Sequence, residues 1–136
     1  MEKLFSEKSV VCGKWVAIMD YARQDRGIIL TAFRTRCLTQ HEIHEFIVCG
    51  PDVIPNKPID KVAYLGFGEI TEGGVVEIGD TVYSDKRLIG TILGFDETHV
   101  PNHYNVIIKM DTPLSGHTLG LKLAEFFSIH FGKNNG

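Results

Sequence analysis

The sequence has no long hydrophobic run and no marked excess of charge of either sign. Its longest apolar runs fall far short of the roughly 20 residues that a membrane-spanning helix needs, and MEKLFSEKSVV at 1–11 lacks the apolar stretch of a signal peptide. Lys and Arg number 14 against 17 Asp and Glu, and no basic block could follow a phosphate backbone. These absences predict a cytoplasmic protein with no membrane segment and no nucleic-acid partner.

Cysteine is also scarce. The chain has three cysteines, Cys12, Cys37 and Cys49, which is an odd number, and none of them forms a CxxC pair. A disulfide framework would use an even set, and a thiolate zinc knuckle needs closely spaced pairs. We therefore expect three reduced, packed thiols.

A third absence concerns helices, because no stretch has a sustained helical pattern of apolar residues. Short apolar runs rich in β-branched and aromatic residues alternate instead with Gly, Pro, Asn and Asp. The expected strands are 9–19, 27–33, 42–49, 61–67, 79–84, 87–95, 104–110 and 125–131. The start of 38–46 (LTQHEIHEF) has a helix-capping pattern, but a strand is favoured for its apolar second half, which stops at Gly50-Pro51.

This pattern predicts an all-β fold. The 136 residues are enough for one domain with its own hydrophobic core, so residues 1–136 are expected to form a single domain. Many short strands are typical of a barrel or a sandwich, since both leave few unpaired edges. The expectation is a single small closed or partly closed β-barrel.

The segment GFDETHVPNHYN at 94–105 differs from the rest because it concentrates titratable side chains around Pro101. In an acid–base interpretation, Asp96 or Glu97 acts as a base and His99 or His103 as an acid or orienting partner. In a metal interpretation, His99, His103 and Glu97 bind zinc or iron. The residues that could complete such a metal site are Glu69, His117 and His130. In a structural interpretation the polar residues form turns, with the histidines solvated or plugging the mouth of a barrel.

Several other polar residues are candidates for binding a substrate. Arg34 and Arg36 alternate in FRTR and would point the same way from a strand, as a clamp for a carboxylate or phosphate. Asn102 and Asn105 in the histidine segment are further candidates, and Arg23 and Arg26 in the charged connection 20–27 could bind an anion. The expected partner is a small polar metabolite, and a homo-oligomer is left open.

Four segments, 29–50, 75–83, 88–111 and 123–131, together resemble the glucitol/sorbitol-specific IIA component of the sugar phosphotransferase system. The resemblance implies a small β-rich barrel. In that family the phosphoacceptor histidine directly follows a Phe-Ile pair, whereas Phe46-Ile47 is followed here by Val48, which has no nucleophilic nitrogen. Cys49 has no basic neighbour in sequence to make it a thiolate. The resemblance therefore implies the fold without the phosphocarrier activity.

Two functions remain open from the sequence, because function depends on the site and not on the fold. The first is a small-molecule enzyme of isomerase, lyase or hydrolase type that uses the segment Asp96–His103. The alternative is a non-catalytic small-molecule-binding or regulatory barrel.

Overall fold

The computed structural model describes residues 9–132, in which nearly all regular structure is β. The strands are β1 (Val11–Arg23), β2 (Thr35–Leu38), β3 (Ile43–Cys49), β4 (Val62–Glu72), β5 (Gly74–Glu77), β6 (Thr81–Ser84), β7 (Arg87–Asp96), β8 (Asn105–Lys109) and β9 (Phe126–His130). The helix α1 (Gly116–Leu119) is a single turn capped by the side chain of Ser115, which accepts a hydrogen bond from the Thr118 N–H. The all-β prediction is confirmed.

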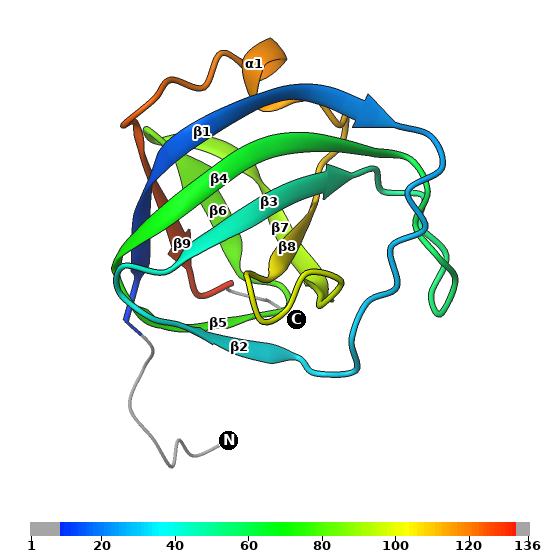
Figure 1. The fold of residues 1–136 in the computed structure, drawn as a ribbon, viewed down its shortest axis with the longest axis horizontal. Helices are drawn as coiled ribbons and strands as arrows, with labels where there is room; N and C mark the ends of the chain where they lie inside the picture. Colours follow the sequence, from blue (N-terminus) through cyan, green and yellow to red (C-terminus); the bar gives the residue numbers. More distant parts are fainter. Residues whose placement is uncertain (1–8, 133–136) are drawn as a thin grey trace.

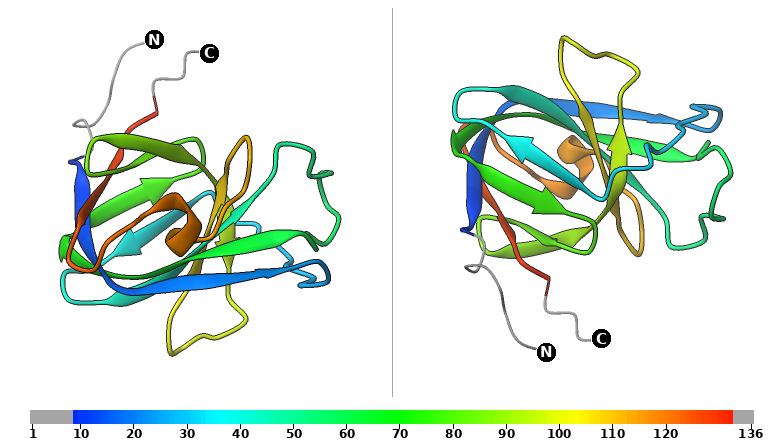
Figure 2. Two further views of the ribbon diagram at one scale, coloured as in Figure 1. Left: turned by 90° about the horizontal axis from the view of Figure 1, so that it is seen from above. Right: turned by 90° about the horizontal axis from the view of Figure 1, so that it is seen from below.

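Seven strands form one sheet that closes on itself in the order β1-β4-β3-β8-β7-β6-β9 (Figure 1). The ring closes because β9 pairs with β1, with Val11 opposite Ile129. Every pairing in this closed barrel is antiparallel except that of β3 with β8. The remaining strands, β2 and β5, pair only with each other and lie across one end of the barrel (Figures 1 and 2).

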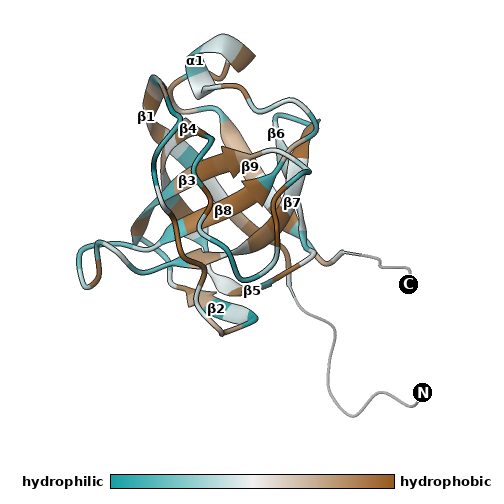
Figure 3. Cartoon of the chain, turned by 90° about the vertical axis from the view of Figure 1, so that its right-hand side faces the viewer, coloured by the Kyte–Doolittle hydropathy of each residue, from teal (hydrophilic) through white to brown (hydrophobic). Residues whose placement is uncertain are grey.

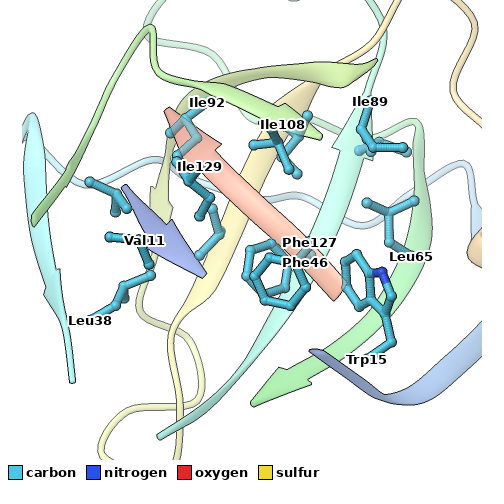
Figure 4. Close-up of a cluster of buried hydrophobic side chains, with 14 of the residues drawn as sticks. Val11, Trp15, Leu38, Phe46, Leu65, Ile89, Ile92, Ile108, Phe127 and Ile129 are labelled. Atoms are coloured by element: carbon cyan, nitrogen blue, oxygen red, sulfur yellow. The ribbon is translucent and has the colours of Figure 1, made fainter. Parts of the chain in front are cut away.

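The barrel interior is filled by large apolar side chains that alternate with outward-facing residues along each strand. Three aromatic rings contact one another there: the Trp15 centroid lies 5.4 Å from Phe46 and 4.7 Å from Phe127, and the latter two are 5.0 Å apart (Figure 4). A Cβ atom at Gly13 would lie 2.2 Å from Phe127 Cζ, and one at Gly68 would lie 2.5 Å from Phe127 Cε2. These two glycines are therefore required by the size of Phe127.

A second apolar cluster lies on the outer side of the barrel wall. In β3, Phe46 and Val48 belong to the interior cluster, whereas Ile47 and Cys49 pack against residues of the two connections that precede β2 and β4. The members of this outer cluster are Ile28, Ile47, Cys49, Ile59, Val62, Tyr64 and Ile107. Because β3 and β8 are buried on both faces, each contains a continuous apolar run, FIVC at 46–49 and VII at 106–108, and β8 lies at the centre of Figure 3 as a strongly hydrophobic strand.

The first connection explains the one predicted strand that is wrong. Residues 27–33 do not join the sheet and form only an isolated bridge between Ile28 and Ile59. Their apolar residues cover the outer face of the barrel instead, a role that produces the same short apolar run as a strand. We call residues 26–36 the cover segment. The other seven predicted strands correspond to β1, β3, β4, β6, β7, β8 and β9, and the strands β2 and β5 were not predicted.

No helix within residues 9–132 has the length and hydrophobicity needed to cross a membrane. The three cysteines are free, as expected, although Cys37 is exposed and only Cys49 is fully buried. Burial raises the pKa of the Cys49 thiol to about 11. Cys49 is therefore protonated at neutral pH, which disfavours its use as a nucleophile.

Candidate functional site

Residues 97–104, which we call the histidine loop, connect β7 to β8 (Figure 2). They are preceded by the buried carboxylate of Asp96. Asp96 accepts hydrogen bonds of 2.7 Å from Thr98 Oγ1 and from Asn105 Nδ2, and its Oδ2 lies 3.7 Å from Arg26 Nη2. Asn105, predicted to bind substrate, is fully buried in this arrangement. These contacts favour an anchoring role for both residues.

Glu97, the second predicted catalytic carboxylate, forms an ion pair with Arg36 of β2. The Arg36 guanidinium also lies 4.2 Å from the ring centroid of Tyr104, a cation–π contact. Arg36 therefore contacts two residues of the histidine loop, Glu97 and Tyr104. The cover segment therefore has an arginine at each end, Arg26 and Arg36, and the two pair with the consecutive acidic residues Asp96 and Glu97. Between them, the Thr31 N–H donates a 2.8 Å hydrogen bond to the Phe95 carbonyl. The end of β7 and the histidine loop thus hold the cover segment against the barrel.

The two histidines of the loop have different environments. The His103 ring is turned inward, with Nε2 3.7 Å from Glu45 Oε1 and Nδ1 2.7 Å from Oδ1 of the exposed Asn102. His99 is exposed and its ring centroid lies 5.1 Å from that of His103. Burial lowers the pKa of His103, and the neighbouring His99 and His44 lower it further. His103 is therefore neutral at neutral pH.

Glu45 is a buried carboxyl group that the sequence reasoning missed. It lies on the outer face of β3, opposite Asn105 of β8. Burial raises its pKa, and the nearby Arg26 opposes this shift while Asp96 adds to it. A charged residue within the apolar run HEFIVC was the available signal, because a buried strand position rarely holds a carboxylate without a partner.

His44 precedes Glu45 and points to the other side of β3, where its ring stacks on Tyr104. Its Nδ1 accepts a 3.0 Å hydrogen bond from the Tyr104 N–H, and its Nε2 lies 2.9 Å from Glu42 Oε1. This arrangement requires the proton on Nε2, which then donates to Glu42. Both ring nitrogens of His44 therefore form hydrogen bonds within the protein, one with the Tyr104 backbone and one with Glu42.

The residues predicted to complete a metal site lie apart from one another. Glu69 Oε2 is 3.8 Å from His41 Nδ1, His117 Nδ1 is 3.6 Å from Asp20 Oδ2, and His130 Nε2 is 2.9 Å from Ser128 Oγ. Throughout residues 9–132 there is no group of three or more His, Cys, Asp or Glu side chains that could hold a metal ion. The geometry gives the predicted zinc or iron site no support.

A groove of about 800 Å³ lies on the outer face of the barrel, beside the cover segment. One side is formed by residues 29–32 and 34 of the cover segment and the other by residues 51 and 53–59, and Leu93 of β7 and Lys109 of β8 also line the groove. Most of its lining is apolar, and Arg34, one of the predicted substrate-binding residues, belongs to it. The other predicted arginines are used elsewhere: Arg23 pairs with Asp25 at 3.1 Å, and Arg26 and Arg36 pair with the histidine-loop end of the barrel.

The groove was missed from the sequence because its two sides are connections separated by β3. The available signal was the composition of 51–59 (PDVIPNKPI), in which three prolines and three aliphatic residues share one loop. A loop of that kind is typical of a binding surface carried by a rigid scaffold.

Residues 5–130 match the model of a family of unknown function, DUF6917. No curated protein and no solved structure matches the chain. Because the match spans nearly the whole sequence, the chain belongs to the DUF6917 family.

Proposed function

We propose that this protein binds a small organic molecule in the groove between residues 29–34 and 51–59 and does not transform it. The observation that carries the proposal is the groove itself, whose volume of about 800 Å³ lies within the range of small-molecule sites. Such sites are lined mainly by apolar side chains with a few polar groups, and the lining of this groove has that character.

Two apolar side chains at the groove remain unusually exposed in the free protein. Ile29 is 69% exposed and Ile54 is 63% exposed, one on each side of the groove. A ligand that lies between them would remove this apolar surface from water, which is favourable by roughly 25 cal/mol per Å². The site therefore gains from an occupant with an apolar body.

Three of the four side chains predicted for catalysis are held by other residues and the fourth, His99, is exposed, which favours binding over chemistry. Asp96 and Glu97 each have an arginine partner, and His103 faces into the protein. Their contacts place the histidine loop in support of the cover segment, which forms one side of the groove. The predicted alternative, a non-catalytic binding barrel, is thus the better-supported proposal.

A screen of metabolites by thermal shift tests the proposal, because a ligand that binds only the folded state raises the melting temperature. Ile54→Asp should abolish the shift produced by a hit, since it places a carboxylate within the apolar lining. Leu123→Asp is the matched control, because Leu123 is 65% exposed and does not line the groove. Equal shifts for wild type and Ile54→Asp would place the ligand elsewhere and refute the proposal.

A second candidate is the predicted isomerase, lyase or hydrolase chemistry, with Glu45 instead of the predicted Asp96 or Glu97 as the carboxyl partner of His103. It is favoured by one observation: the pKa of Glu45 is raised and that of His103 is lowered, so two groups 3.7 Å apart are brought toward similar pKa values. Incubating each screening hit with the protein and following it by NMR tests this candidate. Conversion that is lost in Glu45→Gln would support it, and conversion unchanged in that variant would exclude it.

A further inference from the structure

The charge of the groove lining is of one sign. The lining includes Arg34, Lys57 and Lys109, and among the described residues that line it there is no Asp or Glu. The three cations come from three different parts of the fold, namely the cover segment, the connection before β4, and β8. Since the chain as a whole has a net charge of −3, this local positive charge is not an average property of the surface.

These three cations also differ from the other arginines near the cover segment. Arg23, Arg26 and Arg36 each pair with a carboxylate, whereas no ion pair involves Arg34, Lys57 or Lys109 within the described part of the chain. Their charge is therefore not neutralised by a neighbouring side chain. An anion that enters the groove would meet several cations and no repelling carboxylate in the described lining.

The same lining is apolar away from these cations. Ile59 is buried, Leu30, Val53 and Leu93 are half-buried, and Ile29 and Ile54 are exposed. A simple inorganic anion would leave this apolar surface in water, and an uncharged hydrocarbon would leave the cations without a partner. Both parts of the lining are satisfied by one molecule with an apolar body and an anionic group.

The shape of the site favours a free molecule over a membrane surface. The apolar and basic residues line a groove of about 800 Å³ that is bounded on one side by the cover segment and on the other by the loop before β4. A groove with two walls suits a small ligand. Building on the function proposed above, we infer that the ligand of the groove is an amphipathic organic anion that is free in solution and is bound through Arg34, Lys57 and Lys109.

Three probes with the same ten-carbon chain test this inference: decanoate, 1-decanol and decyltrimethylammonium, each titrated below its critical micelle concentration by calorimetry. Decanoate is expected to bind with one-to-one stoichiometry and at least about tenfold more tightly than 1-decanol, since hydrogen bonds to charged groups are the stronger class. Decyltrimethylammonium should bind most weakly. The preference for decanoate over 1-decanol should shrink as salt is added, because the three cations are exposed.

Variants of the cations locate the effect. Arg34→Gln, Lys57→Gln and Lys109→Gln should each weaken decanoate binding several-fold and leave 1-decanol binding unchanged, whereas the exposed control Lys122→Gln should alter neither. Equal affinities for decanoate and 1-decanol would overturn the inference and leave the proposed function standing. If none of the probes bound, the inference would be overturned, and the metabolite screen with Ile54→Asp would decide the proposed function separately. Binding of phosphatidylglycerol vesicles without stoichiometric binding of decanoate would also overturn the inference, in favour of a membrane surface.

Discussion

The role of Asp96 can be tested by its contribution to stability. The carboxylate is 3% exposed and is held by Asn105 Nδ2 and Thr98 Oγ1, both at 2.7 Å, with Arg26 Nη2 at 3.7 Å. Asp96→Ala would leave the buried Asn105 amide without its acceptor, which costs about 1–3 kcal/mol. It would also leave Arg26, whose side chain is 13% exposed, without its carboxylate.

Removing one partner of a buried ion pair typically costs about 3–5 kcal/mol, and we expect Asp96→Ala to lower the free energy of unfolding by this amount. The measurement is urea denaturation followed by tryptophan fluorescence, because the single tryptophan, Trp15, lies in the barrel interior. His99→Ala, at an exposed position of the same loop, is the control and should stay within about 0.5 kcal/mol of wild type. A decrease in the free energy of unfolding below about 1 kcal/mol for Asp96→Ala would refute the anchoring role, and Asp96 would again be a candidate catalytic residue.

Three further predictions follow from the described contacts. Because burial lowers the pKa of His103 in the folded state, the unfolded chain takes up the proton first as the pH falls below about 6.5. The free energy of unfolding should therefore decrease on acidification. Urea denaturation at pH 7.5 and 5.5 should show a smaller decrease for His103→Gln than for wild type, and an equal decrease would contradict this prediction. The exposed Cys37 should react with a thiol reagent in the native protein, whereas Cys49, with its pKa raised to about 11, should react only after unfolding. In the denatured, unreduced chain, labelling followed by mass spectrometry should count three thiols. Since Val48 follows Phe46-Ile47 and is fully buried, the protein should take no phosphoryl group from a phosphorylated histidine carrier protein, and a mass increase of one phosphate under alkaline conditions would show otherwise.

The strands of the closed sheet could be predicted from the sequence because their apolar runs are bounded by turn residues. The error at 27–33 has a physical cause: an apolar segment that covers a sheet and an apolar strand within it have the same local composition, and only tertiary pairing distinguishes them. The strands β2 and β5 escaped prediction because they are short and half exposed, as in TRCL and GVVE. Each contributes one buried residue, Leu38 or Val76, to the interior cluster.

The candidate site was only partly predictable for a related reason. The density of polar residues at 94–105 drew attention to the connection between β7 and β8, but the partners of those residues come from distant parts of the chain, as Arg26, Arg36 and Glu45 show. No local pattern indicates that Glu97 will meet Arg36 or that His103 will face Glu45. The groove depends even more on tertiary structure, since its two sides are connections that lie together only once β3 is paired in the sheet.

The pairing of β9 with β1 has a consequence for the order of folding. The first and last strands of the described chain are neighbours in the sheet, so this contact has one of the largest sequence separations that the fold contains. Contacts of this kind form late and slow the folding of β proteins, because loop closure must precede them. During synthesis, β1 and β6 therefore each keep an unpaired edge until β9 has emerged, and this is the stage at which the chain is most exposed to aggregation through strand addition.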